Sequence, residues 1–251
     1  TATDPTVTSS PVSNASSRNM FDDSWYWNPI RAVGKSGDAK FNRRDFTGAI
    51  VDYDYVMSKG INHSILWKKA EAEEQLGQTE RACDHFLEAL TNTDSHFASI
   101  VDEPLRWWHL AEIAGRLNRQ ELVERAWSET IRCGSFDDQE YDDGNVSPCI
   151  GPGERGLKAG ALLAVSRAYW RKDTGKAIYF AKQALVQCPD WETGRFCLAF
   201  LMINYEDPYN TRAMIFEARD TMRDLNKHAK DPIVQRAARN WVKTIGEDPD
   251  K

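Results

Sequence analysis

The 251-residue sequence has no long apolar run and no excess of basic residues. Its longest apolar stretch covers residues 196–203, whereas a membrane-spanning helix needs about 20 apolar residues. The formal net charge is −6, which argues against a broad nucleic-acid-binding surface because such a surface requires clustered lysine and arginine. The sequence therefore predicts no transmembrane segment and no nucleic-acid partner.

Cysteine and histidine are also sparse, and they form no recognisable metal-binding or catalytic pattern. The five cysteines include no CxxC pair, and the five histidines are scattered along the chain. No Ser/His/Asp or Cys/His grouping has the spacing of a known catalytic motif. We therefore expect no catalytic residue, no metal site and no cofactor. Cys133 and Cys149 flank one loop, and the sequence leaves open whether they form a disulfide.

Helical periodicity is the signal that the sequence does carry, and it is clearest over residues 65–90. Two apolar patterns on either side of Gly77 predict two short helices joined by a turn, in which glycine adopts a left-handed conformation. The small residues Ala70 and Ala82 allow these helices to approach closely, and Phe86 fills the space between them. A hairpin this short needs neighbours to bury its remaining apolar surface.

Related hairpins occur on both sides of this segment. A shift of 33 residues places Ala49 at the position of Ala82, and a shift of 41 residues places Trp108 at the position of Trp67. Two more divergent pairs follow, and a last helix would close the array at about residue 245. We predict an all-α, right-handed solenoid of about five antiparallel helix pairs with a C-terminal capping helix.

Two segments lie outside the repeat pattern. The composition of residues 1–28 predicts an extended N-terminal arm. Its anchor would be the aromatic residues Phe21, Trp25, Tyr26 and Trp27. Residues 29–251 predict the solenoid, interrupted by an inserted acidic loop over residues 134–156 that is rich in Asp, Gly and Pro.

The N-terminal region also bears on localisation. The sequence begins at Thr1 and its first residues are rich in Ser and Thr, which favours a processed protein of a plastid, a mitochondrion or the secretory path. Glycosylation sequons begin at Asn14, Asn62 and Asn145, and the sequence does not show whether they carry glycans.

The hairpins resemble tetratricopeptide repeats (TPR), whose 34-residue unit has small residues at the helix contact, an aromatic residue on the second helix and a closing proline. The resemblance covers roughly residues 29–220, and its matching residues are Gly37, Ala49, Tyr53, Ala70, Gly77, Ala82, Phe86, Ala89, Ala111, Trp127, Ala177, Ala184 and Pro189. The half-a-TPR repeats of RNA-processing proteins are an alternative, suggested by Trp67 and Glu74. Gly115 stands at the corresponding acidic position of the next copy, so we prefer the TPR interpretation.

The TPR resemblance implies that the first helix of each pair lines a concave groove. Two indoles and two carboxylates would then lie in this groove, from Trp67, Glu71, Trp108 and Glu112. Such a groove suits a hydrophobic or cationic side chain of a bound peptide. The alternative is that the tryptophans pack between repeats and the glutamates are solvated.

One familiar use of the family is not expected here. Family members that bind chaperone tails hold a C-terminal carboxylate with Lys, Asn and Arg. The comparable positions in this sequence are Asp38, Glu71, Glu112 and Ser166. An acidic groove repels a carboxylate, so we predict no binding of a chaperone C-terminal tail.

These observations predict a non-catalytic scaffold or adaptor that is a structural subunit of a larger assembly and binds protein subunits or peptides. One alternative is a transient peptide receptor that uses the Trp67/Trp108 groove. A second alternative is an enzyme built on a helical-repeat scaffold, which would need a convergent set of titratable residues.

Overall fold

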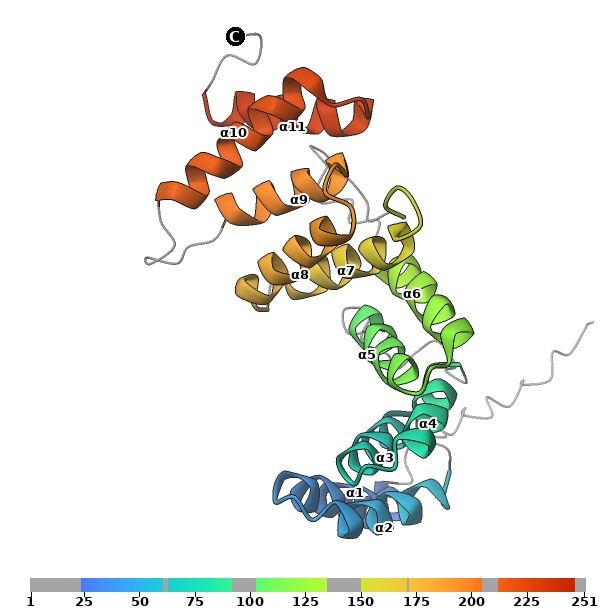
Figure 1. Ribbon diagram of the computed structural model, residues 1–251. Helices are drawn as coiled ribbons and strands as arrows, with labels where there is room; N and C mark the ends of the chain where they lie inside the picture. The colour runs from blue at the N-terminus through green and yellow to red at the C-terminus, as the bar shows by residue number, and fades with distance from the viewer. Residues whose placement is uncertain are drawn as a thin grey trace, which may run out of the picture.

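The computed structural model describes residues 24–60, 63–91, 103–134, 150–170, 172–204 and 212–246, which form eleven helices and no strand (Figure 1). Consecutive helices pack as antiparallel pairs, and the pairs follow one another in an extended arc with α1 and α11 at opposite ends. Among the helices of these residues, none combines the length and apolar composition that crossing a lipid bilayer requires.

Five helix pairs and one further helix make up the array. The pairs are α1 (Ser24–Asn42) with α2 (Phe46–Met57), α3 (His63–Gln75) with α4 (Thr79–Thr91), α5 (Glu103–Arg116) with α6 (Gln120–Gly134), α7 (Gly156–Tyr169) with α8 (Thr174–Gln187), and α9 (Glu192–Ile203) with α10 (Arg212–His228). The last helix, α11 (Pro232–Thr244), packs on α10 and α9. The structure confirms the predicted all-α, TPR-like array of helix pairs with a terminal helix.

The turns of the first three pairs share one backbone geometry. Each contains a residue in the left-handed region, with φ of 63° at Arg44, 75° at Gly77 and 56° at Asn118. The next residue in each turn donates its N–H over 2.9 Å to the carbonyl five residues earlier. This hydrogen bond is the signature of a Schellman turn at the end of a helix. The prediction for Gly77 is confirmed, and Asn118 and Arg44 adopt the same conformation.

The first helix begins earlier than the sequence indicated. It starts at Ser24 and contains Pro29, so residues 24–28 of the predicted arm are helical. Pro29 lacks an N–H and so removes only the hydrogen bond to the carbonyl of residue 25, one turn from the helix end. Phe21 and the side chains of Trp25, Tyr26 and Trp27 lie outside the described residues, so their role as an anchor stays a prediction.

The predicted loop falls between α6, which ends at Gly134, and α7, which begins at Gly156. Residues 135–149 are outside the described part of the chain, and Cys149 is among them. Cys133 is buried at the end of α6, and burial raises the pKa of its thiol to about 12.

Buried apolar residues in the described part of the chain form three clusters. The first joins α1, α2 and the start of α3, the second lies among α3–α6, and the third lies among α7–α11. Residues that carry the TPR resemblance lie where helices meet. Tyr53 and Phe86 are almost completely buried, and a Cβ on Gly37 would lie only 2.7 Å from the Tyr53 ring. The array therefore consists of closely packed helix pairs with separate local cores.

Candidate functional site

The second helix pair is linked to the first by two lysines of α3. The Lys68 ammonium lies 2.8 Å from Asp38 Oδ2 on α1, and the Lys69 ammonium lies 2.6 Å from Asp54 Oδ1 on α2. Lys69 is buried, whereas the Lys68 and Asp38 side chains are each about two-fifths exposed. Both ion pairs join successive repeats and fix the position of α3 against its neighbours.

Other side chains of α3 contact the third helix pair. Glu74 Oε2 lies 2.9 Å from His109 Nε2 on α5, and Glu74 Oε1 accepts a hydrogen bond from Arg116. Arg106, also on α5, places its guanidinium 5.2 Å from the centre of the Trp67 ring, within the range of a cation–π contact. Charged side chains therefore connect the first helices of three consecutive pairs.

Trp67 and Glu71, which the sequence placed in the groove, interact with each other. The Trp67 Nε1–H donates to Glu71 Oε1 over 2.8 Å, one helical turn away. Trp67 is only 8% exposed, and its ring centre lies 4.4 Å from that of Phe86. The indole therefore packs between α3 and α4, and the Glu71 carboxylate already accepts a hydrogen bond.

Trp108 occupies the same repeat position but packs in another direction. Its ring lies 6.1 Å from that of Phe180 on α8, as part of the cluster formed by α7–α11. Glu112 is exposed on α5. The structure thus brings Trp67 and Glu71 together but places Trp108 in a different core cluster. The roles of Trp67, Glu71, Trp108 and Glu112 in binding a partner stay predictions.

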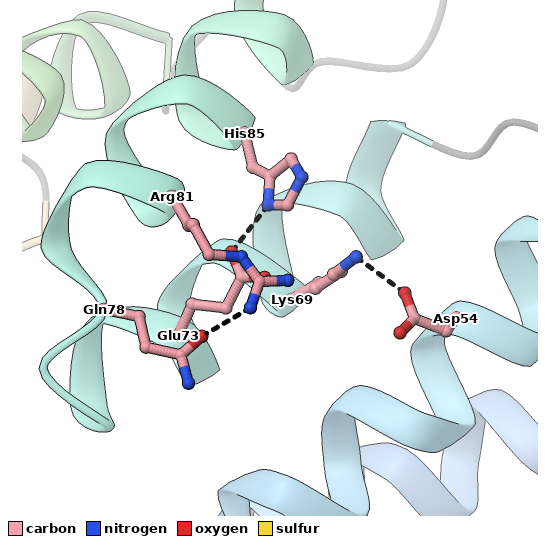
Figure 2. A network of polar contacts seen from close by, with 6 residues as sticks. All are labelled: Asp54, Lys69, Glu73, Gln78, Arg81 and His85. Atoms are coloured by element: carbon pink, nitrogen blue, oxygen red, sulfur yellow. Dashed lines mark hydrogen bonds and ion pairs between the residues drawn. The ribbon is translucent and has the colours of Figure 1, made fainter.

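A polar network surrounds the buried Glu73 side chain in the second helix pair (Figure 2). Glu73 on α3 is completely buried, and its Oε2 lies 2.6 Å from His85 Nδ1 on α4. Its Oε1 lies 3.2 Å from an Arg81 guanidinium nitrogen, an ion pair without hydrogen-bond geometry. Arg81 also donates to Gln78 over 3.0 Å. These contacts join α3 to α4 and compensate the cost of burying the carboxylate.

The burial of Glu73 was not predicted from the sequence. A signal was present, because Glu73 follows Ala70 by three residues and Leu66 by seven, the spacing of one helix face. Both of those residues are buried. An acidic residue at an apolar position of a helix therefore predicted a buried carboxylate that needs partners on the facing helix.

Three of the positions compared with chaperone-binding repeats are engaged within the chain, and one of them is Glu71, which accepts the hydrogen bond from Trp67. Ser166 is completely buried, and its hydroxyl donates to the Ala177 carbonyl over 2.7 Å, so its assignment to the groove was wrong. Asp38 accepts a hydrogen bond from the Tyr53 hydroxyl over 3.0 Å. Burial, and then the bond to Asp38, raise the pKa of Tyr53. The absence of chaperone-tail binding stays a prediction.

The solved structures that resemble this chain have low sequence identity to it. No family model matches the sequence, and no curated protein matches it. A solved structure of MamA, residues 41 to the end, from Desulfovibrio magneticus RS-1 is 12% identical, with a TM-score of 0.38 over 78% of this chain and 97% of that chain. The TPR2AB domain of yeast Sti1, in a complex with pHSP90, is 13% identical, with a TM-score of 0.37 over 84% of this chain and 98% of that chain.

A crystal structure of MamA protein is 14% identical to this chain, with a TM-score of 0.39. The aligned region covers 80% of this chain and 95% of the MamA chain. The helix pairs of the chain itself, with their buried small residues and shared turn geometry, define the class of protein as a TPR-like repeat protein.

Proposed function

We propose that this chain is a non-catalytic scaffold, a structural subunit that holds other proteins along its extended array. The observation that carries the proposal is the contrast between the first and the second helices of the pairs. Charged side chains of α1, α3 and α5 pair with one another across the repeats. Second helices of the pairs, called the outer helices below, include α8 and α10, which expose large apolar side chains. These are Tyr179 and Val186 on α8 and Phe216 on α10. Exposed apolar surface of this kind is suited to contact with partner proteins.

The burial of Trp67 favours this proposal over a transient peptide receptor. A peptide that used the Trp67/Trp108 groove would need an accessible indole, whereas Trp67 packs against Phe86 and donates its N–H to Glu71. If the chain were a transient peptide receptor, Trp67→Ala would abolish peptide binding without changing the stability of the fold. The scaffold predicts that the same substitution lowers stability, because it removes a buried aromatic side chain.

The polar network around Glu73, in the described part of the chain, does not favour the alternative that this protein is an enzyme. The network around Glu73 consists of side chains that are paired with one another between α3 and α4. Within residues 24–246 as far as they are described, no group of three or more His, Cys, Asp or Glu side chains could hold a metal ion.

The proposal is tested by purifying the tagged chain from its native source and measuring the mass of the complex by native mass spectrometry. We expect a defined complex with at least one other protein, cross-linked to residues of the outer helices. The double variant Tyr179→Ala/Phe216→Ala should release that partner while its melting temperature stays that of the wild type. A monomeric chain that co-purifies with no other protein would contradict the proposal.

A further inference from the structure

The exposed face of α8 differs from the outer faces of α4 and α6. Tyr179 is 57% exposed and Val186 is 62% exposed, and they lie two helical turns apart on one side of α8. Lys176 and Lys182 are exposed on the same side. This stripe therefore combines two large apolar side chains with two positive charges.

The corresponding positions of α4 and α6 carry charge instead. Tyr179 lies two residues after Ala177, the first buried residue of α8. The same offset from the first buried residue gives Asp84 on α4 and Arg125 on α6, and Asp84 forms an ion pair with Arg119. An outer face can thus be fully polar in this array, so the apolar residues of α8 are not a requirement of the repeat.

Aromatic residues beneath the stripe hold Tyr179 in place. Its ring packs edge-on against Phe180, with the ring centres 5.3 Å apart. Phe180 in turn stacks on Tyr169 of α7 at 5.6 Å and contacts Trp108 of α5 at 6.1 Å. A tyrosine that is supported in this way loses little conformational entropy when a partner covers it, which is a property of aromatic anchors in interfaces.

The segment that contains α8 carries net positive charge although the whole chain is acidic. Residues 150–204 contain eight lysines and arginines against four acidic residues, whereas the net charge of the chain is −6. Lys176 lies 3.6 Å from Asp173, a partner that is itself 43% exposed. Lys182 forms no ion pair with another residue in the described ranges. An acidic ligand would therefore find an available cation next to the apolar side chains.

We infer that this face of α8 is a docking surface for an acidic segment of a partner protein that carries an aromatic or aliphatic side chain. The inference rests on the proposed scaffold function and names the chemistry of one partner. Lys176 and Lys182 pair with carboxylates of the segment, and its apolar side chain packs on Tyr179 and Val186. The ion pairs set orientation and association rate, and the apolar contact provides the anchor.

The test measures binding of fluorescent probes to the full chain by anisotropy. The first probe is a short peptide of alternating glutamate and phenylalanine, and the second replaces each glutamate with glutamine. Tyr179→Ala and Lys182→Glu are the α8 variants. Tyr55→Ala and Lys59→Glu are matched controls on α2, where Lys59 lies over the Tyr55 ring at 5.1 Å.

We expect the glutamate probe to bind, and each α8 variant to raise its Kd about fivefold or more, the range of an interface anchor. The controls should change the Kd by less than about twofold, and added salt should weaken binding. Equal binding of the glutamine probe, or an equal loss in the α2 controls, would overturn the inference. Because all four positions are exposed, unchanged melting temperatures separate lost binding from lost folding.

Other occupants of the surface give distinct results, and each would overturn the inference. A nucleic-acid surface would bind a single-stranded oligonucleotide more tightly than the glutamate probe. A contact between two copies of this chain would show as a dimer that Tyr179→Ala dissociates. An intramolecular contact would show as tighter probe binding after neutralising the acidic residues of segment 135–149. If the native complex forms but the probe does not bind, the inference fails and the scaffold proposal stands.

Discussion

Glu73 and His85 lie on the facing helices α3 and α4, with the buried Oε2 of the carboxylate 2.6 Å from the imidazole Nδ1. Arg81, the other partner of Glu73, has a side chain that is 61% exposed. His85 is the less exposed of the two partners and the closer one. The pairing of α3 with α4 therefore depends on a polar contact inside an otherwise apolar helix pair.

Removing the imidazole should destabilise the protein. We expect His85→Ala to lower the free energy of unfolding by about 1–3 kcal/mol, because it leaves a buried carboxylate with one fewer partner. The measurement is urea denaturation followed by circular dichroism. His228→Ala, at an exposed position near the end of α10, is the control and should change stability by less than about 0.5 kcal/mol. Equal effects of the two substitutions would contradict this role of His85.

Stability should fall at alkaline pH because of Tyr53. Its pKa is raised in the folded state, so the folded protein retains the phenolic proton at a pH where the unfolded chain loses it. This contribution to stability is complete below pH about 10, the ordinary pKa of tyrosine, and is lost as the pH rises beyond it. Tyr53→Phe should flatten the pH dependence of the melting temperature in this range. An unchanged dependence would show that other groups cause it.

Two glycines of α1 should respond in opposite ways to alanine. A Cβ on Gly37 would lie 2.7 Å from the Tyr53 ring, so we expect Gly37→Ala to cost about 1–3 kcal/mol of stability. A Cβ on Gly34 would lie 3.9 Å from its nearest neighbours, an ordinary contact. Gly34→Ala should therefore stabilise the helix by about 0.5–1 kcal/mol. Thermal unfolding of both variants measures the difference, and effects of the same sign would refute the proposed close contact.

The three equivalent turns predict a second pair of opposite effects. Arg44 adopts φ of 63°, where a side chain costs energy, so Arg44→Gly should raise stability by up to about 1 kcal/mol. Gly77 adopts φ of 75°, so Gly77→Ala should lower stability by about 1–2 kcal/mol. Chemical denaturation of each variant against the wild type checks both signs. Stabilisation by Gly77→Ala would contradict the left-handed geometry.

The repeat architecture could be predicted because its determinants are local. Small residues, apolar spacing and the turn at Gly77 recur along the sequence, and they located α3, α4 and the pairs related to them. The start of α1 could not be located in this way. The solenoid was predicted to begin at residue 29, yet a proline within the first turns removes only one hydrogen bond, and the helix begins before it at Ser24.

The surroundings of a side chain were harder to predict than its repeat position. Trp67 and Trp108 are equivalent in the alignment of repeats, but Trp67 meets Phe86 of its own pair and Trp108 meets Phe180 of another. An alignment of repeats gives the face on which a residue lies. It does not give the neighbour that covers this face, because the connections between pairs differ in length.

The division of the core into three clusters has a consequence for the synthesis of this chain. Each cluster is built from helices that are close in the sequence, so its contacts can form as soon as those helices have left the ribosome. The first cluster is complete once the beginning of α3 has emerged, well before α11 has been translated. We therefore expect the protein to fold vectorially during translation, with the N-terminal pairs folded while the C-terminal cluster is still incomplete.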